Sequence, residues 1–121
     1  MALNGAQKRI LESIVDGMGK AEKMIKASIA EVGRSGNRIF LDQSLGKAIG
    51  ELILWETWIA TLKDRDRTPV VKGIHGSVCS CLSACYKLSG DSVRSREYAH
   101  KALSLPISEE ERTAIRESIG V

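Results

Sequence analysis

The sequence predicts an all-α protein, an up-and-down helical bundle of four main helices followed by a short C-terminal helix. Apolar residues recur at alternating spacings of three and four along most of the chain, which is the period of an α-helix. Residues typical of helix starts and ends separate these segments, and the links between them are short. Short links favour antiparallel neighbours, so we expect consecutive helices to run up and down.

The first helix is expected to begin after Asn4 and to run to about Gly33. Asn4 and Gln7 form a plausible capping pair, because the asparagine can accept from an early amide while the glutamine reaches back. The apolar stripe that follows consists of Leu11, Ile14, Met18, Ala21, Ile25, Ser28 and Val32. Gly17 and Gly19 interrupt this segment, and each glycine costs ~1 kcal/mol relative to alanine. We therefore expect them to weaken the helix.

The second helix is expected to start at Asp42 or Ser44 as N-cap and to reach about Lys63. Its main stripe consists of Leu45, Ala48, Leu52, Trp55, Ile59 and Leu62. Further apolar side chains, Ile49, Ile53, Leu54 and Trp58, occupy much of the remaining circumference. A helix that is apolar almost all round is typical of an enclosed element, so we expect this one to be central.

The third helix is predicted from Pro69 to about Ser89. Thr68 followed by Pro69 is a start signal, because proline is tolerated at the first helical position. Gly90 is placed to end the helix in a left-handed conformation. The apolar stripe consists of Val71, Ile74, Val78, Cys81, Cys85 and Leu88.

Two shorter helices complete the chain. Asp91 or Ser92 is expected to cap the fourth, which reaches Leu105 before Pro106. Ser108 precedes three glutamates and predicts the start of the fifth, since acidic side chains suit the positive end of a helix. The residues expected to face inward are Ala99, Ala102 and Leu103 in the fourth helix, and Ala114, Ile115 and Ile119 in the fifth.

The bulk properties predict one helical domain over residues 1–121. A chain of 121 residues with 43% hydrophobic and 27% charged residues is typical of a folded soluble protein. No apolar run approaches the ~20 residues that span a bilayer, and the N-terminus lacks the pattern of a secretory signal. We therefore expect a cytoplasmic protein without membrane contact, whose three cysteines remain thiols.

Four residues of metal-ligand type lie close together in the third helix: His75, Cys79, Cys81 and Cys85. At roughly 100° per residue, Cys79 and Cys81 point about 200° apart, so one continuous helix cannot direct all four side chains to one ion. We expect no bound metal or cofactor, with Cys81 and Cys85 in the core. His75 and Cys79 remain weak metal candidates, and Cys79 is expected to be the exposed thiol.

Arg34 and Arg38 flank the first loop and are the candidate nucleic-acid contacts. Acidic residues interrupt the basic ones nearby, and the net charge of +3 is small. A concentrated basic stripe with aromatic side chains for stacking is typical of nucleic-acid binders and is missing from this sequence. Nucleic-acid binding is therefore possible but not favoured.

Leu54 and Trp58 lie four positions apart, roughly opposite the main stripe of their helix. They either contact another helix of the same chain or form an exposed patch, and tryptophan is enriched at protein interfaces. The sequence contains no phosphate-binding glycine loop and no nucleophile motif, so no enzyme activity is expected.

The preferred hypothesis is a small non-catalytic protein-interaction or assembly subunit, self-associating as a homodimer through Leu54 and Trp58 or joining a larger assembly. One alternative is a nucleic-acid-associated accessory protein that uses Arg34 and Arg38. The other is a metal- or redox-responsive protein that uses the cysteine-containing helix.

Overall fold

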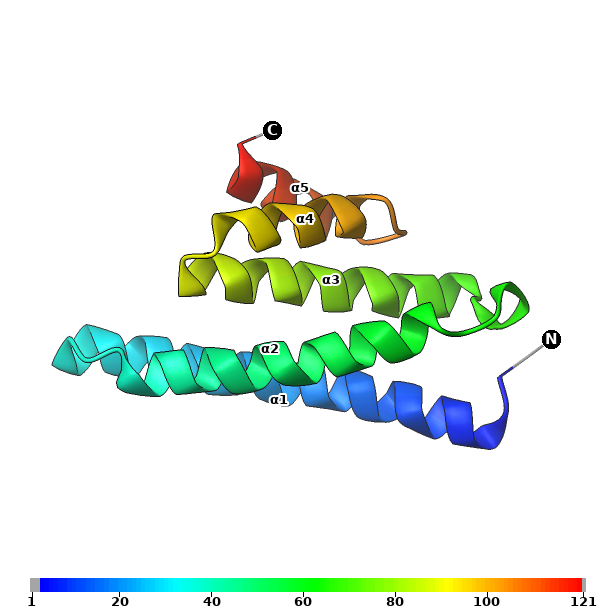
Figure 1. Ribbon diagram of the computed structural model, residues 1–121, viewed down its shortest axis with the longest axis horizontal. Coiled ribbons are helices and arrows are strands. Elements are labelled where there is room, and N and C mark those ends of the chain that lie inside the picture. The colour runs from blue at the N-terminus through cyan, green and yellow to red at the C-terminus, as the bar shows by residue number, and fades with distance from the viewer. Residues whose placement is uncertain (1–2, 121) are drawn as a thin grey trace.

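Five α-helices and one short 3-10 turn make up the computed structural model, which describes residues 3–120 (Figure 1). They are α1 (Gly5–Ser35), α2 (Ile39–Ala60), η1 (Asp64–Asp66), α3 (Pro69–Ser89), α4 (Ser92–Leu103) and α5 (Glu109–Ile119). No strand occurs between residues 3 and 120, and no helix of this range is long and apolar enough to cross a membrane. The predicted all-α class is confirmed.

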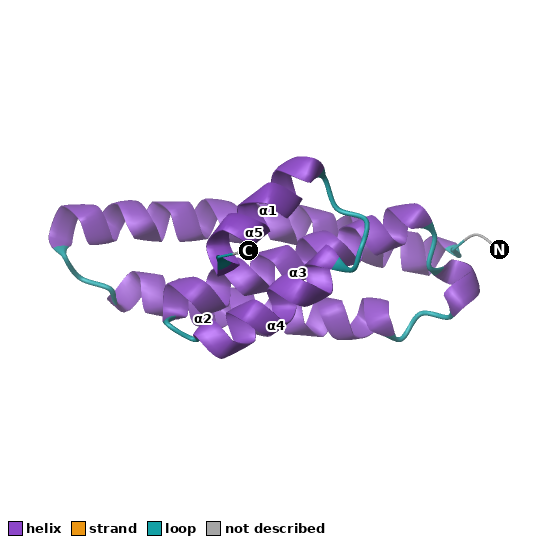
Figure 2. Ribbon diagram, turned by 90° about the horizontal axis from the view of Figure 1, so that it is seen from above, coloured by secondary structure: helices purple, strands orange, loops and turns teal. Residues whose placement is uncertain are grey.

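The helices follow one another in space as they do along the chain. Consecutive helices reverse direction, and the main contacts join α1 to α2, α2 to α3, α3 to α4 and α4 to α5. Seen from above, α3 lies between the side that carries α1 and the side that carries α2 and α4 (Figure 2). Contacts between α1 and α3 are few. This leaves α1 attached mainly to α2.

Most helix ends follow the local signals in the sequence. Asn4 and Gln7 form the expected capping box, with hydrogen bonds of 2.8 and 3.0 Å. The Thr68 hydroxyl accepts from the amide of Val71, and Gly90 ends α3 with φ of 89°. Local hydrogen bonds and the conformational freedom of glycine decide these ends, which is why they can be predicted without tertiary information.

The predicted start of α2 is wrong. The helix begins at Ile39, before Asp42 and Ser44, because the Asn37 side chain accepts a 2.8 Å hydrogen bond from the Ile39 amide. Ser44 is instead buried inside the helix and lies 2.8 Å from the Ser28 hydroxyl of α1. α2 also ends earlier than expected, at Ala60.

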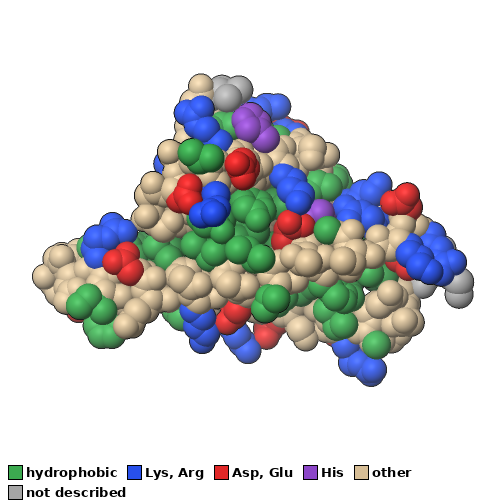
Figure 3. Space-filling view, in the orientation of Figure 1, with side chains coloured by type: hydrophobic (Ala, Val, Ile, Leu, Met, Phe, Trp, Pro, Cys, Tyr) green, Lys and Arg blue, Asp and Glu red, His purple; other side chains and the backbone are tan. Residues whose placement is uncertain are grey.

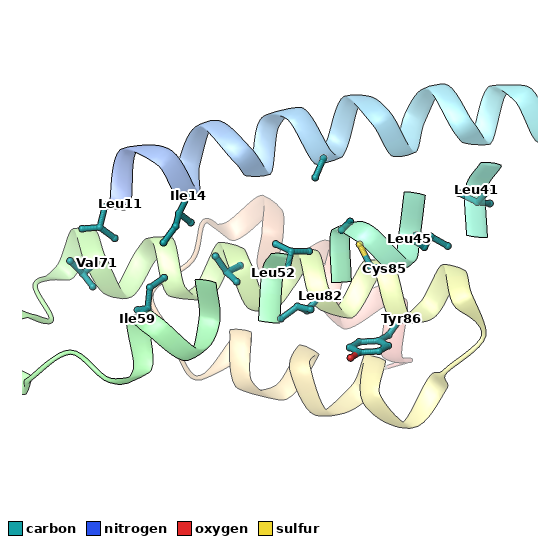
Figure 4. Close-up of a cluster of buried hydrophobic side chains, with 13 residues drawn as sticks. Leu11, Ile14, Leu41, Leu45, Leu52, Ile59, Val71, Leu82, Cys85 and Tyr86 are labelled. Carbon is teal, nitrogen blue, oxygen red and sulfur yellow. The ribbon is translucent and has the colours of Figure 1, made fainter. Parts of the chain in front are cut away.

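One large apolar cluster joins α1, α2 and α3 (Figure 4). Its buried members are Leu11, Ile14, Ala21, Leu41, Leu45, Ala48, Leu52, Ile59, Val71, Val78, Leu82, Cys85 and Tyr86. The stripes predicted for the first three helices supply most of them. A second, smaller cluster joins α3 to α4 and α5 and consists of Cys79, Ala99, Ala102, Ile115 and Ile119.

The enclosed helix is α3, and the expectation that α2 is surrounded is wrong. Leu54 of α2 is 70% exposed, whereas α3 buries one face against α2 and another beneath α4 and α5. Small residues make this possible. At Gly76 an added Cβ would collide with the side chain of Ile107, so the α4–α5 loop rests directly on the α3 backbone. Ala114 of α5, expected inside, is exposed.

Candidate functional site

The two weak metal candidates are both buried. His75 is 3% exposed and Cys79 is fully buried in the second cluster, so the expectation that Cys79 is the exposed thiol is wrong. The reason is that α4 and α5 cover the face of α3 that carries it. Among residues 3–120, no group of three or more His, Cys, Asp or Glu side chains could hold a metal ion.

His75 belongs to a buried polar network that joins three helices and a loop. Its Nε2 lies 3.0 Å from Oε2 of Glu56 on α2, and the other Glu56 oxygen accepts a 2.9 Å bond from Nζ of Lys101 on α4. On the other side of the ring, Nη2 of Arg67 lies 2.9 Å from Nδ1. Arg67 also donates to the carbonyl of Ile59 at 3.1 Å.

These partners determine the proton positions. Arginine can only donate, so Nδ1 of His75 must accept, and Nε2 carries the proton that is donated to Glu56. Burial lowers the pKa of His75, and the Arg67 and Lys101 charges lower it further against the opposing effect of Glu56. Burial alone would raise the pKa of Glu56, but the hydrogen bonds from Lys101 and His75 outweigh it and lower the pKa.

His75 and Cys79 do not form an activated thiol pair. Cys79 lies one helical turn after His75, but burial and the Glu56 charge raise the pKa of its thiol to about 12. Both imidazole nitrogens already have partners, so neither is available to activate the thiol. Every buried side-chain nitrogen and oxygen in the described part of the chain has a hydrogen-bond partner. The network therefore holds α2, α3, α4 and the α2–α3 loop together.

An open apolar groove lies on the other side of α3, facing α1. Two hollows of about 610 Å³ and 230 Å³ follow one another between these helices, and we call them together the α1–α3 groove. From α1 the apolar lining comes from Leu11, Val15, Met18, Ala21, Ile25 and Ile29. From α3 it comes from Val70, Val71, Ile74, Cys81, Ala84, Cys85 and Leu88.

The groove exposes large apolar side chains to solvent. Val70 is 71% exposed, Val15 is 50% exposed, and Ile29 and Leu88 are about 40% exposed. Leu52 of α2 contributes to the lining between the two helices. A contiguous apolar surface of this kind is typical of an interaction site, whereas scattered single residues need no explanation.

The two arginines of the first loop already have partners. Arg34 pairs with Glu31 on the same helix. Arg38 donates to the carbonyl of Leu88 at 3.0 Å and lies 3.5 Å from a carboxylate oxygen of Asp42. Both side chains remain more than half exposed. Nucleic-acid contact by these residues stays a prediction, and the adjacent carboxylates weaken it.

Leu54 and Trp58 do not behave as one surface. Trp58 is half-buried against the large cluster and lines a hollow beside Ile10 and Leu62. Leu54 is exposed. Trp58 thus packs partly within the chain, and contact of either residue with a partner stays a prediction.

Sequence reasoning missed Glu56, Arg67, Lys101 and the α1–α3 groove. A signal for Glu56 was present, since a carboxylate on the most apolar helix requires a buried partner. The exposed apolar residues of the groove carry no such signal, because each belongs to a predicted stripe or directly neighbours a stripe residue in the sequence. Comparison of the chain with protein-family models, with curated proteins and with solved structures gives no match in any of the three cases.

Proposed function

We propose that this chain is a non-catalytic protein-interaction module that binds one α-helix of a partner protein in the α1–α3 groove. The observation that carries the proposal is the groove itself, where the two long helices α1 and α3 leave apolar side chains open to solvent. Docking an amphipathic helix into an apolar groove is a common mode of peptide recognition. Burying these side chains supplies the driving force at about 25 cal/mol per Å².

The charges on the rim favour a different protein over a second copy of this chain. Along α1 the charged rim residues are Lys8, Glu12, Asp16, Glu22 and Lys26. If two copies paired antiparallel with their grooves centred near Gly17, lysine would face lysine and glutamate would face glutamate. Like charges placed opposite one another disfavour that pairing. Self-association therefore serves as the competing outcome of the test.

The test uses an amphipathic helical peptide of roughly five turns, about 18 residues, with a leucine stripe and uncharged polar flanks. We expect binding in a 1:1 ratio, with the largest NMR shifts at groove residues. Ala84→Glu, which places a charge at an exposed position in the groove, abolishes binding.

The matched control is Leu54→Glu, which puts the same charge at an exposed position of α2 outside the groove. This variant should bind the peptide normally. Light scattering of the free chain completes the test. Binding lost in Leu54→Glu but kept in Ala84→Glu, or a dimer that Ala84→Glu dissociates, overturns the proposal, and the second result favours assembly between copies.

A further inference from the structure

Two carboxylates from different helices lie near Cys81, at the middle of the α1–α3 groove. Cys81 lines the groove, and burial raises the pKa of its thiol to about 11, with Cys85, Glu111 and Glu22 adding to the shift. Glu22 lines the groove from α1. Glu111 stands on α5 and accepts a 3.4 Å hydrogen bond from the Ser77 hydroxyl of α3, which fixes it beside the same turn. One carboxylate thus lines the groove, and the other contacts α3 one turn before Cys81, just beyond the groove lining.

The cations near these carboxylates leave much of that charge uncompensated. Glu22 pairs with Lys26 on its own helix, but both side chains are more than 60% exposed, and such pairs stabilise little. No salt bridge joins Glu111 to a cation within residues 3–120. Arg112, the nearest basic residue in sequence, is held elsewhere, because it donates to the carbonyls of Leu103 and Leu105.

The floor between the carboxylates is narrow. Ser77, Cys81 and Ala84 lie at spacings of four and three on α3 and therefore share one face. None of them has a side chain longer than two heavy atoms beyond Cα. The backbone of a docked helix could approach α3 closely here, which would bring residues on both of its flanks within reach of Glu22 and Glu111.

Resting on the function proposed above, we infer that the partner helix is amphipathic, with lysine or arginine residues on both sides of its apolar stripe. The aliphatic stems of these residues lie along apolar walls while the charged ends reach the carboxylates. Complementary charges at the edge of an interface contribute mainly to specificity and to the association rate. Glu22 and Glu111 are thus the specificity-determining residues of the groove.

Three peptides test this inference. They share one leucine stripe and differ only in their flanks, which are lysine, glutamate or an uncharged polar residue. With two exposed ion pairs formed, we expect the lysine peptide to bind about tenfold more tightly than the uncharged one, and the glutamate peptide more weakly. High salt should reduce the difference.

The Glu22→Gln/Glu111→Gln double variant should lose the preference for lysine and keep its affinity for the uncharged peptide. Glu97→Gln, at an exposed position on α4, is the matched control and should keep the preference. The inference fails, and the proposed function stands, if the uncharged peptide binds in the groove but lysine flanks do not increase the affinity. The same conclusion follows if the double variant still prefers the lysine peptide. If no peptide binds in the groove, the proposed function fails with it.

Discussion

The two sides of α3 differ in how far other helices cover them. Toward α2 and α4, the carboxylate of Glu56 bridges His75 and Lys101, and apolar side chains fill the crevice between α2 and α4 (Figure 3). Tyr86 and Tyr98 stack in the same region, with ring centroids 5.7 Å apart. Toward α1, apolar walls face solvent across the α1–α3 groove.

This difference separates a structural region from one suited to binding. Buried hydrogen-bonded charges require defined partners at defined positions, so they hold α2, α3 and α4 in one arrangement. Apolar walls impose no such directional requirement and remain able to accept another helix. Changes on the closed side of α3, or where α1 packs on α2, should therefore affect stability more than matched changes elsewhere.

The largest expected effect comes from Glu56→Ala. It leaves the His75 N–H without its acceptor and Lys101 without its carboxylate partner, so we expect the free energy of unfolding to fall by about 3 kcal/mol. Denaturant unfolding measures this. Glu51→Ala, more than one turn away on the same helix and only half-buried, should change stability by less than about 0.5 kcal/mol. Equal losses in the two variants would contradict a structural role for the network.

Two glycines of α1 test how tightly this helix packs on α2. An added Cβ at Gly17 would lie 2.5 and 2.8 Å from ring atoms of Trp55, whereas at Gly19 it would meet nothing within 4 Å. We expect Gly17→Ala to destabilise by about 2 kcal/mol through overpacking, and Gly19→Ala to stabilise by about 0.5–1 kcal/mol through helix propensity. Thermal unfolding of both variants gives the comparison, and a gain in Gly17→Ala would mean that α1 is loosely held.

Acid should reduce the stability that His75 and Glu56 contribute on the closed side of α3. The folded-state pKa of His75 lies below its ordinary value of 6.5, so the unfolded chain takes up a proton more readily. Stability conferred by neutral His75 is therefore present above pH 6.5 and is lost as the pH falls toward the folded-state pKa. The lowered pKa of Glu56 adds a further loss below about pH 4.5.

The unfolding free energy measured between pH 7 and pH 5 should thus decrease, by less than the loss in Glu56→Ala. His75→Gln, which can still accept from Arg67 and donate to Glu56, should flatten the profile in this range. A profile that keeps its slope in this variant would assign the dependence to another group.

The smallest effect is expected in the groove. Val70 is 71% exposed and Val78 is fully buried, although both stand on α3. Val70→Ala should change stability by less than about 0.5 kcal/mol, while Val78→Ala should cost about 2 kcal/mol through lost burial and the cavity left behind. Chemical denaturation of the two variants shows whether the groove wall contributes to the fold. A large loss in Val70→Ala would place that wall in the core.

Local signals in the sequence determined the helices and most of their ends. Asn4 with Gln7, Thr68 with Pro69, and Gly90 act through hydrogen bonds and backbone freedom within a few residues. The apolar stripes also indicated which residues face the core. These features can be predicted because periodicity defines each side chain's direction around its own helix axis.

Only the tertiary structure decided what each face meets. Glu56 finds His75 and Lys101, which lie 19 and 45 positions away, and Cys79 lies buried because α4 and α5 cover it. For the same reason the α1–α3 groove could not be found in advance, since its walls continue the stripes that form the core. A helical period gives the direction of a side chain but does not specify whether a neighbouring helix or solvent lies there.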